Sequence, residues 1–154
     1  MICISLVGYA GEELKGKVTS VVDGNTIIVT TSTQETYKIL LHGIDSPDPG
    51  QEYAEQAKKF LERLLLTKAV TILMHGKDRY GNRIGDIHID GTINPQKELV
   101  KAGLAWTSEK NPVEELESIK EEARLSGRGL WGEKAPTPPW VFRRQQSMMQ
   151  PKSS

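Results

Sequence analysis

Cysteine is almost absent from this sequence, with Cys3 as its single representative. One thiol excludes an intramolecular disulfide, and it gives no information about the redox compartment. Net charge is also lacking, because Lys plus Arg and Asp plus Glu both number 20. Proteins that bind nucleic acid without sequence preference usually carry a basic excess, since phosphate neutralisation supplies most of their affinity. The overall charge therefore gives no support to a strong polyanion partner and leaves room only for a local basic patch.

Long apolar runs are missing as well. None approaches the roughly 18 residues that a membrane-spanning helix requires, so the sequence predicts no membrane association. The chain has 154 residues, of which 37% are hydrophobic and 26% charged. That is enough for one domain built around one core. We expect a monomer.

The first residues have some features of a secretory signal. Gly8 and Ala10 are small, as a cleavage site requires, but a basic n-region is lacking and the apolar stretch is short. We assign 1–14 to an N-terminal segment that is either a signal-peptide remnant or a frayed end. This segment favours an exported protein, with a cytoplasmic location as the alternative.

The chain from 15 to 42 has the pattern of β-strands. Residues rich in β-branched side chains occupy 17–22, 26–31 and 36–42, and the tight-turn pair Asp23-Gly24 joins the first two. Two more strands are predicted at 70–74 and 83–89, on either side of an Asp-Arg-Tyr-Gly turn.

Helical periodicity appears between the third and fourth predicted strands. Apolar side chains recur there at i, i+4, i+7, i+8 and i+11, which places them on one face of a helix. They are Tyr53, Ala57, Phe60, Leu61 and Leu64.

Two Asn-Pro pairs predict the starts of two further helices. Asn94 and Asn111 each precede a proline, which is the arrangement of an N-cap followed by proline at the first helical position. Glu114 would complete a capping box with Asn111. After the third helix, prolines indicate an extended segment up to 144, and the polar stretch 145–154 is predicted to be disordered.

The predicted order of elements is β-β-β-α-β-β-α-α. Five strands with a helix between the third and fourth are typical of an OB-fold barrel, whose open face often binds oligonucleotides or oligosaccharides. We therefore predict an α+β fold, a five-stranded OB-fold barrel plus three helices, over 15–144.

Seven segments, in order along the chain, resemble the staphylococcal nuclease (thermonuclease) family. They are 21–27 (VVDGNTI), 41–48 (LHGIDSPD), 50–57 (GQEYAEQA), 78–81 (DRYG), 98–106 (ELVKAGLAW), 127–131 (GRGLW) and 138–140 (PPW). The resemblance implies a phosphodiesterase that cuts DNA and RNA with one Ca²⁺. In that family two aspartates and a backbone carbonyl hold the ion, a glutamate activates water, and two arginines clamp the phosphate.

The metal-binding positions are only partly kept. By the resemblance, Asp45 matches one aspartate ligand and Ser46 provides the carbonyl, but the other aspartate position holds Asn25. Calcium prefers several oxygen ligands, and its affinity follows their charge. We therefore expect Ca²⁺ binding to be weak or absent.

The catalytic positions have changed further. Asp48 matches the general base but is one methylene shorter, while the two arginine positions hold Leu40 and Asn82. Lys38, one pleat from Leu40, and Arg83, next to Asn82, are possible substitutes. A lysine cannot reproduce a bidentate guanidinium, and adjacent strand residues point to opposite faces, so solvated or structural roles are favoured for both.

The remaining candidates for chemistry are interpreted as structural. The three histidines, His42, His75 and His88, are scattered over strands without metal-ligand spacing, so a zinc site is not expected. The tryptophans match family positions that seal the helices onto the barrel; they are Trp106, Trp131 and Trp140.

The sequence therefore predicts a thermonuclease-type OB-fold domain with a degraded Ca²⁺ site. It would act as a binding or scaffold module, with single-stranded nucleic acid as a possible ligand. The alternative is a weak Ca²⁺-dependent endonuclease that uses Asp45, Asp48, Lys38 and Arg83. A third hypothesis is a protein- or peptide-binding module, which would bind no nucleic acid.

Overall fold

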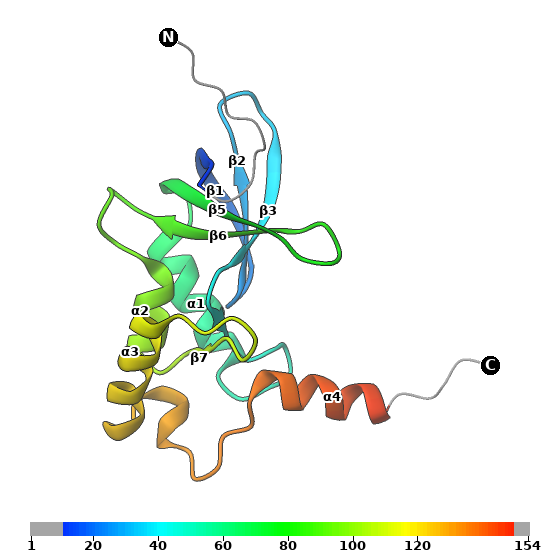
Figure 1. Cartoon of the computed structure of the whole chain (residues 1–154), viewed down its shortest axis with the longest axis vertical. Coiled ribbons are helices and arrows are strands. Elements are labelled where there is room, and N and C mark those ends of the chain that lie inside the picture. The colour runs from blue at the N-terminus through cyan, green and yellow to red at the C-terminus, as the bar shows by residue number, and fades with distance from the viewer. Residues whose placement is uncertain (1–10, 150–154) are drawn as a thin grey trace, which may run out of the picture.

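The structure is a computed structural model that describes residues 11–149. Five strands form a closed barrel in the order β1-β2-β3-β6-β5 (Figure 1). These strands are β1 (Glu13–Asp23), β2 (Thr26–Thr30), β3 (Thr36–Leu41), β5 (Ala69–Lys77) and β6 (Arg83–His88). The predicted OB-fold barrel is confirmed. Because β1 begins at Glu13, the barrel includes the end of the segment 1–14, of which residues 1–10 lie outside the described part.

The strands pair antiparallel around the barrel except at one seam. There β3 and β6 run parallel and share three residue pairs, Ile39↔Arg83, Leu40↔Ile84 and Leu41↔Gly85. Two short strands, β4 (Ile44–Asp45) and β7 (Trp106–Thr107), form a separate antiparallel pair. Strand β4 follows β3 directly, and its pairing with β7 sets the course of the chain through Asp45.

Four helices of the described part lie beyond one end of the barrel. They are α1 (Ala54–Leu65), α2 (Pro95–Lys101), α3 (Glu114–Leu125) and α4 (Pro139–Met149), with a 3-10 turn, η1 (Gly129–Gly132), before α4. Of these, α1 and α2 pack against the strands of the barrel. The helix predicted between the third and fourth strands is α1. It buries Ala54, Ala57, Leu61 and Leu65, so its innermost face is turned slightly from the predicted one. Among residues 11–149, no helix is both long and apolar enough to cross a bilayer.

The core lies inside the barrel and beneath α1. Inward side chains from all five strands of the barrel are completely or nearly completely buried, as expected for a small barrel filled by its own side chains. They include Val18, Ile27, Val29, Ile39, Ile72 and Ile87. Of the predicted site residues, Asn25, Asp45, Ser46 and Asp48 lie outside this hydrophobic core, at a turn, a strand end and a loop.

One predicted helix start is confirmed and one is wrong. The Asn94 side chain accepts a hydrogen bond from the Lys97 amide at 2.9 Å and caps α2. Helix α3, by contrast, begins at Glu114 with Val113 at the N-cap position and no capping side chain. Asn111 instead belongs to a loop in which its backbone N–H donates to the Ser108 hydroxyl at 3.1 Å.

The extended tail predicted after the third helix is also wrong, because residues 139–149 form α4. Pro139 is buried and opens the helix, where its fixed φ is favourable. Trp140 packs edge-on against Trp106, with ring centroids 5.6 Å apart. These contacts anchor a helix whose far end extends away from the rest of the molecule (Figure 1). Of the predicted disordered stretch, 145–149 is helical and 150–154 lies outside the described residues.

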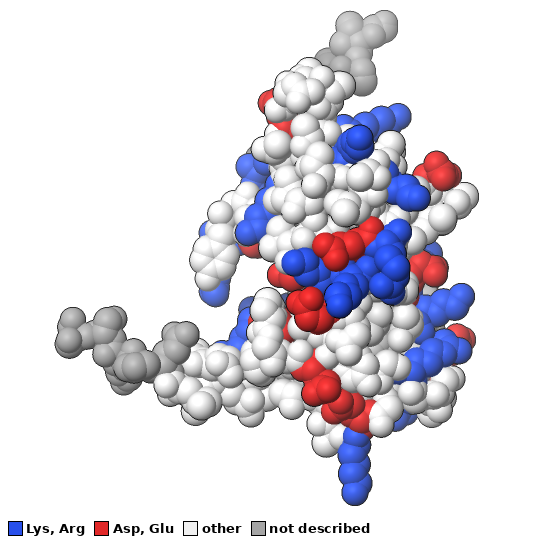
Figure 2. Space-filling view, turned by 180° about the vertical axis from the view of Figure 1, so that it is seen from behind, with Lys and Arg blue, Asp and Glu red and all other residues white. Residues whose placement is uncertain are grey.

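Charged side chains of both signs are interspersed on the surface. On the face seen in Figure 2, Lys and Arg lie among Asp and Glu and do not form a continuous basic surface. This distribution agrees with the net charge of zero.

Candidate functional site

A groove of about 520 Å³ lies where the β1–β2 hairpin, the end of β3 and helix α4 meet. Its lining includes Asn25, Leu40 and Asp45, all predicted as site positions, together with Arg143 from α4. A larger groove of about 780 Å³, on the surface of β1, β2 and β5, contains none of the predicted site residues. The smaller groove is therefore the candidate site.

The tip of the β1–β2 hairpin reaches this groove because of Gly24. A Cβ atom there would lie 2.7 Å from the Cβ of Ser46 and 2.8 Å from that of Ala57, closer than side chains tolerate. Ser46 is fully buried, and its hydroxyl donates to the Gly24 carbonyl at 3.0 Å. The hairpin is thus held against the loop that follows β4.

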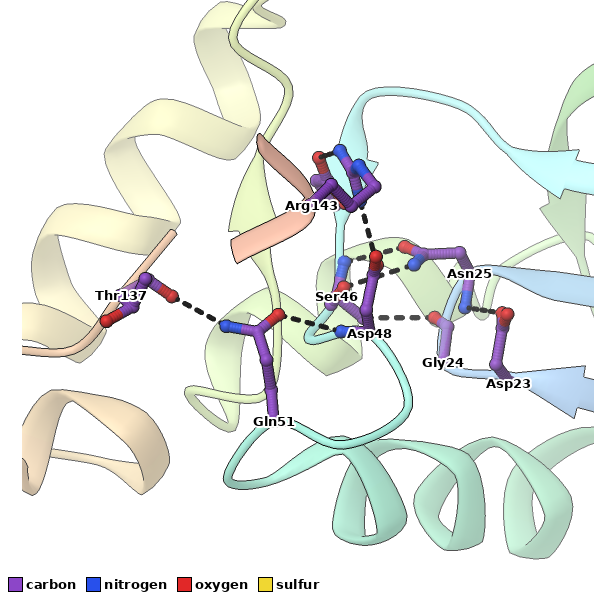
Figure 3. Close-up of polar contacts among 9 residues, drawn as sticks. Asp23, Gly24, Asn25, Ser46, Asp48, Gln51, Thr137 and Arg143 are labelled. Atoms are coloured by element: carbon purple, nitrogen blue, oxygen red, sulfur yellow. Dashed lines mark hydrogen bonds and ion pairs between the residues drawn. The ribbon is translucent and has the colours of Figure 1, made fainter. Parts of the chain in front are cut away.

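Asn25 and Ser46 form a reciprocal pair (Figure 3). The Ser46 backbone N–H donates to Oδ1 of Asn25 at 2.6 Å, and Nδ2 of Asn25 donates to the Ser46 carbonyl at 3.1 Å. The backbone donor fixes which end of the amide is oxygen. The family resemblance assigns two oxygens here to metal binding, Oδ1 of Asn25 and the carbonyl of Ser46. Each of them instead accepts a hydrogen bond from the other residue.

Arg143 bridges the two acidic residues of the site (Figure 3). Its Nη2 lies 2.7 Å from Oδ2 of Asp45, and its Nη1 lies 3.2 Å from Oδ1 of Asp45 and 2.8 Å from Oδ1 of Asp48. The hydrogen bond to Asp45 raises the pKa of Arg143 above its usual value. A guanidinium is well suited to such a planar, bidentate contact.

Asp48 is held from two sides. Its backbone N–H donates to Oε1 of Gln51 at 2.9 Å, and Nε2 of Gln51 donates to the Thr137 carbonyl just before α4. Gln51 thereby links the acidic loop to the segment that delivers Arg143 (Figure 3). Burial raises the pKa of Asp48 despite the attraction of Arg143, so the ion pair opposes an unfavourable loss of hydration.

The arginine positions and their suggested substitutes provide no second cation in the groove. Leu40 lines the wall. Asn82 closes the turn before β6, where its backbone and side chain both donate to Asp78. Lys38 is exposed and does not line the groove. Arg83 lies over the Tyr37 ring, 4.5 Å from its centroid. The structure thus places Arg83 on an aromatic side chain outside the groove.

The interpretation of the histidines as scattered is wrong for two of the three. His42 and His75 stack with ring centroids 3.8 Å apart, and both contact Asp86. Burial acts to raise the pKa of Asp86, but the hydrogen bonds from the two imidazoles outweigh it and lower that pKa to about 2. His88 lines the larger groove.

Sequence reasoning missed Arg143 and this cluster. Arg143 is separated from Asp45 by 98 positions and lies in a segment without a strong helical pattern. The cluster draws one residue from each of three chain segments, so no local spacing reports it. The alternation of side chains along β3 and β6 could have suggested the cluster only after the strand pairing was known.

Comparison with known proteins agrees with the resemblance that the sequence motifs indicate. Residues 38–133 match the family described as "Staphylococcal nuclease homologue". An uncharacterized endonuclease of Escherichia coli is 35% identical over 134 residues, 85% of this chain and 86% of that protein. One of Haemophilus influenzae is 30% identical over 133 residues, 86% of this chain and 74% of that protein. A probable staphylococcal-like nuclease of Oryza sativa subsp. japonica is 34% identical over 111 residues, 70% of this chain and 33% of that longer protein.

Proposed function

Because this chain belongs to the staphylococcal nuclease family, we propose that it is a nuclease-type barrel whose metal-dependent site is filled by its own side chains. In this proposal it acts as a binding or scaffold module with little or no nuclease activity. The single observation that carries the proposal is the contact of Arg143 with both Asp45 and Asp48.

The two hydrogen-bonded arrangements supply what a cation would otherwise supply. An aspartate at position 25 would set a carboxylate oxygen against the Ser46 carbonyl, and only a bridging cation would make that arrangement favourable. The Asn25 amide removes this need, because it donates to the same carbonyl. The Arg143 guanidinium plays the corresponding part between the two carboxylates. Calcium would have to displace it and would gain at most two formal charges from the site.

The groove is also poorly suited to hold a phosphate. Among its described lining residues Arg143 is the only Lys or Arg, and it is already bonded to two carboxylates. Asp23 and Asp45 line the same groove. Phosphate binding depends on positive charge that is not already paired with carboxylates. We therefore expect single-stranded nucleic acid either to bind weakly in this groove or to bind on another surface.

A weak Ca²⁺-dependent endonuclease is the second candidate. It is favoured by the relatives named endonuclease, one of which is 35% identical over most of both chains. In this case Arg143 would leave the carboxylates and turn to the phosphate when metal and substrate enter.

One gel assay separates these functions. Fluorescent single-stranded DNA is incubated with the full chain in Ca²⁺ or in chelator, and mobility and cleavage are read together. We expect no Ca²⁺-dependent cleavage. Digestion that is lost in chelator and in Asp45→Asn protein would overturn the proposal in favour of the endonuclease. A shift without cleavage identifies a nucleic-acid ligand, and the absence of both favours a protein or peptide ligand.

A further inference from the structure

His42 and His75 line the same groove as Asp45, and both contact the Asp86 carboxylate. We propose that His42, His75 and Asp86 form a binding site for a first-row divalent transition-metal ion, with Zn²⁺ as the best-matched ion. The three groups offer ligand atoms that all lie within 4.8 Å of one another. This inference does not depend on whether the groove cleaves, or binds, nucleic acid.

The barrel brings together a residue just after β3, one in β5 and one in β6. His42 directly follows β3, and its backbone N–H donates to the Gly85 carbonyl at 3.0 Å, next to Asp86. His75 lies where the β5–β6 register shifts between Met74 and Gly76. A bulge of this kind redirects one side chain, and here that side chain points to the cluster.

Both imidazoles already contact the carboxylate of Asp86. His42 Nδ1 lies 3.3 Å from Oδ1 of Asp86, and His75 Nε2 lies 2.7 Å from Oδ2. Each contact shares a hydrogen atom that a metal ion would replace. Binding requires the stacked rings to tilt until both nitrogens point at one ion. The three side chains are between 23% and 33% exposed, which leaves room for this movement.

A buried glutamine fixes the carboxylate from behind. Gln96 is 1% exposed, and its Nε2 donates to Oδ1 of Asp86 at 2.9 Å and to the His42 carbonyl at 3.1 Å. Its Oε1 accepts from the Ile87 backbone at 3.1 Å. Outer hydrogen bonds of this type orient ligands in known metal sites, and their loss typically lowers metal affinity about 10–100-fold.

The type of ligand separates this site from the calcium position of the family. Imidazole with one carboxylate suits Zn²⁺ and its neighbours in the first row, whereas Ca²⁺ takes oxygen ligands. Three protein ligands leave further coordination positions open, as in catalytic zinc sites. His42 and His75 line the groove, so an open position would face its interior.

Calorimetric titration of the untagged full chain with ZnCl₂ tests the site. We expect one Zn²⁺ per chain and no competition by equimolar Ca²⁺. His75→Gln and Asp86→Asn should each weaken binding by about 100-fold or more, because loss of a ligand exceeds loss of an outer hydrogen bond. His88→Gln and Asp45→Asn are the matched controls, and each should bind Zn²⁺ as the parent does. Cys3→Ser protein excludes the single thiol as the ligand.

A second measurement needs no variant of the cluster. Zn²⁺ titration followed by NMR should shift the ring signals of His42 and His75 and leave those of His88 unchanged, and Co²⁺ should give visible absorption of a site with nitrogen ligands. Equal Zn²⁺ affinity in parent and His75→Gln protein would refute the proposal. So would a titration that shifts only His88, or one that shows no binding at millimolar Zn²⁺.

Discussion

The Asn25 carboxamide and the Ser46 backbone are joined by two hydrogen bonds in opposite directions, one of 2.6 Å and one of 3.1 Å. Ser46 is fully buried, so water does not compete easily for either bond. This pair ties the first hairpin to the acidic loop.

Replacing Asn25 by aspartate should destabilise the metal-free protein. A carboxylate cannot donate to the Ser46 carbonyl, and loss of one bond in a buried pair typically costs about 1–3 kcal/mol. Millimolar Ca²⁺ should restore part of that loss, because a cation can bridge the two oxygens. Urea unfolding with and without Ca²⁺ measures both effects. Asn111→Asp, in the same groove, is the control, and identical behaviour of the two variants would contradict the explanation.

Arg143 should compete with calcium. The parent chain is expected to bind Ca²⁺ with a dissociation constant weaker than about 10 µM, which is outside the range of tight protein sites. Arg143→Gln should improve that affinity at least tenfold, since the two carboxylates lose their guanidinium. Stability should change by only about 0–1 kcal/mol, because the arginine is 48% exposed. Calorimetry of this variant beside Arg144→Gln makes the comparison, and equal affinities would be evidence against competition.

Nuclease activity should be lower than in family members with complete sites by more than about 10³. One lost donor at a charged transition state costs about 10²–10³ in rate, and an arginine at a transferring phosphoryl group is worth roughly 10³–10⁵. The losses at Leu40 and Asn82 overlap, as groups acting on one transition state usually do. Single-turnover cleavage of labelled DNA measures the deficit, and a rate typical of the family would disprove it.

The charges that the family resemblance assigns to three positions of the site can be introduced together. Asn25→Asp, Leu40→Arg and Asn82→Arg in one protein should produce Ca²⁺-dependent cleavage. Adding Arg143→Gln should increase it further by freeing Asp45. Asn82→Arg also removes a side-chain bond to Asp78, so the turn must be checked by thermal unfolding. Lys38→Arg in the same background serves as the control for a guanidinium outside the groove, and it should add no cleavage.

One ion pair outside the site should contribute a pH-dependent stability. Hydrogen bonds from Lys120 and then Thr107 lower the pKa of Glu117 below its ordinary value of 4.5. The unfolded chain therefore binds the proton more readily. The contribution is fully present above pH 4.5 and is lost as the pH falls through the lowered pKa. With Glu117 38% exposed, we expect about 0.5 kcal/mol. Unfolding of Glu117→Gln and Glu122→Gln at pH 6 and pH 3 checks this, and a difference between the two variants that does not depend on pH would count against it.

The fold was largely predictable because its signals are local. Alternating side chains and the Asp23-Gly24 turn indicate the hairpin, and the Tyr53–Leu64 periodicity indicates α1. Asn94 caps α2 as predicted. Asn111 failed as a cap because its loop makes other hydrogen bonds, which decide the start of α3. The start of α4 was missed because its prolines were interpreted as marking an extended tail, although proline is equally favourable at a first helical turn.

The candidate site was predictable only in part, and for a different reason. Motif order placed Asn25, Asp45, Ser46 and Asp48 near one another, and the structure does bring them together. Whether another side chain supplies positive charge at the two aspartates depends on residues from distant segments of the chain. Arg143 comes from a helix beyond all the recognised site motifs, and its partners become clear only in three dimensions.

The short parallel seam between β3 and β6 implies an order of folding. It joins Ile39 to Arg83 across the whole of α1 and β5, whereas the β1–β2 and β2–β3 pairs join strands that are neighbours along the chain. Contacts between distant segments form late, because the loop between them must first be closed. On the ribosome the β1–β2 and β2–β3 pairs can therefore form before the β3–β6 seam. Asp45 and Asp48 emerge long before Arg143 is synthesised, so the nascent domain exposes this acidic pair until α4 brings the Arg143 guanidinium to it.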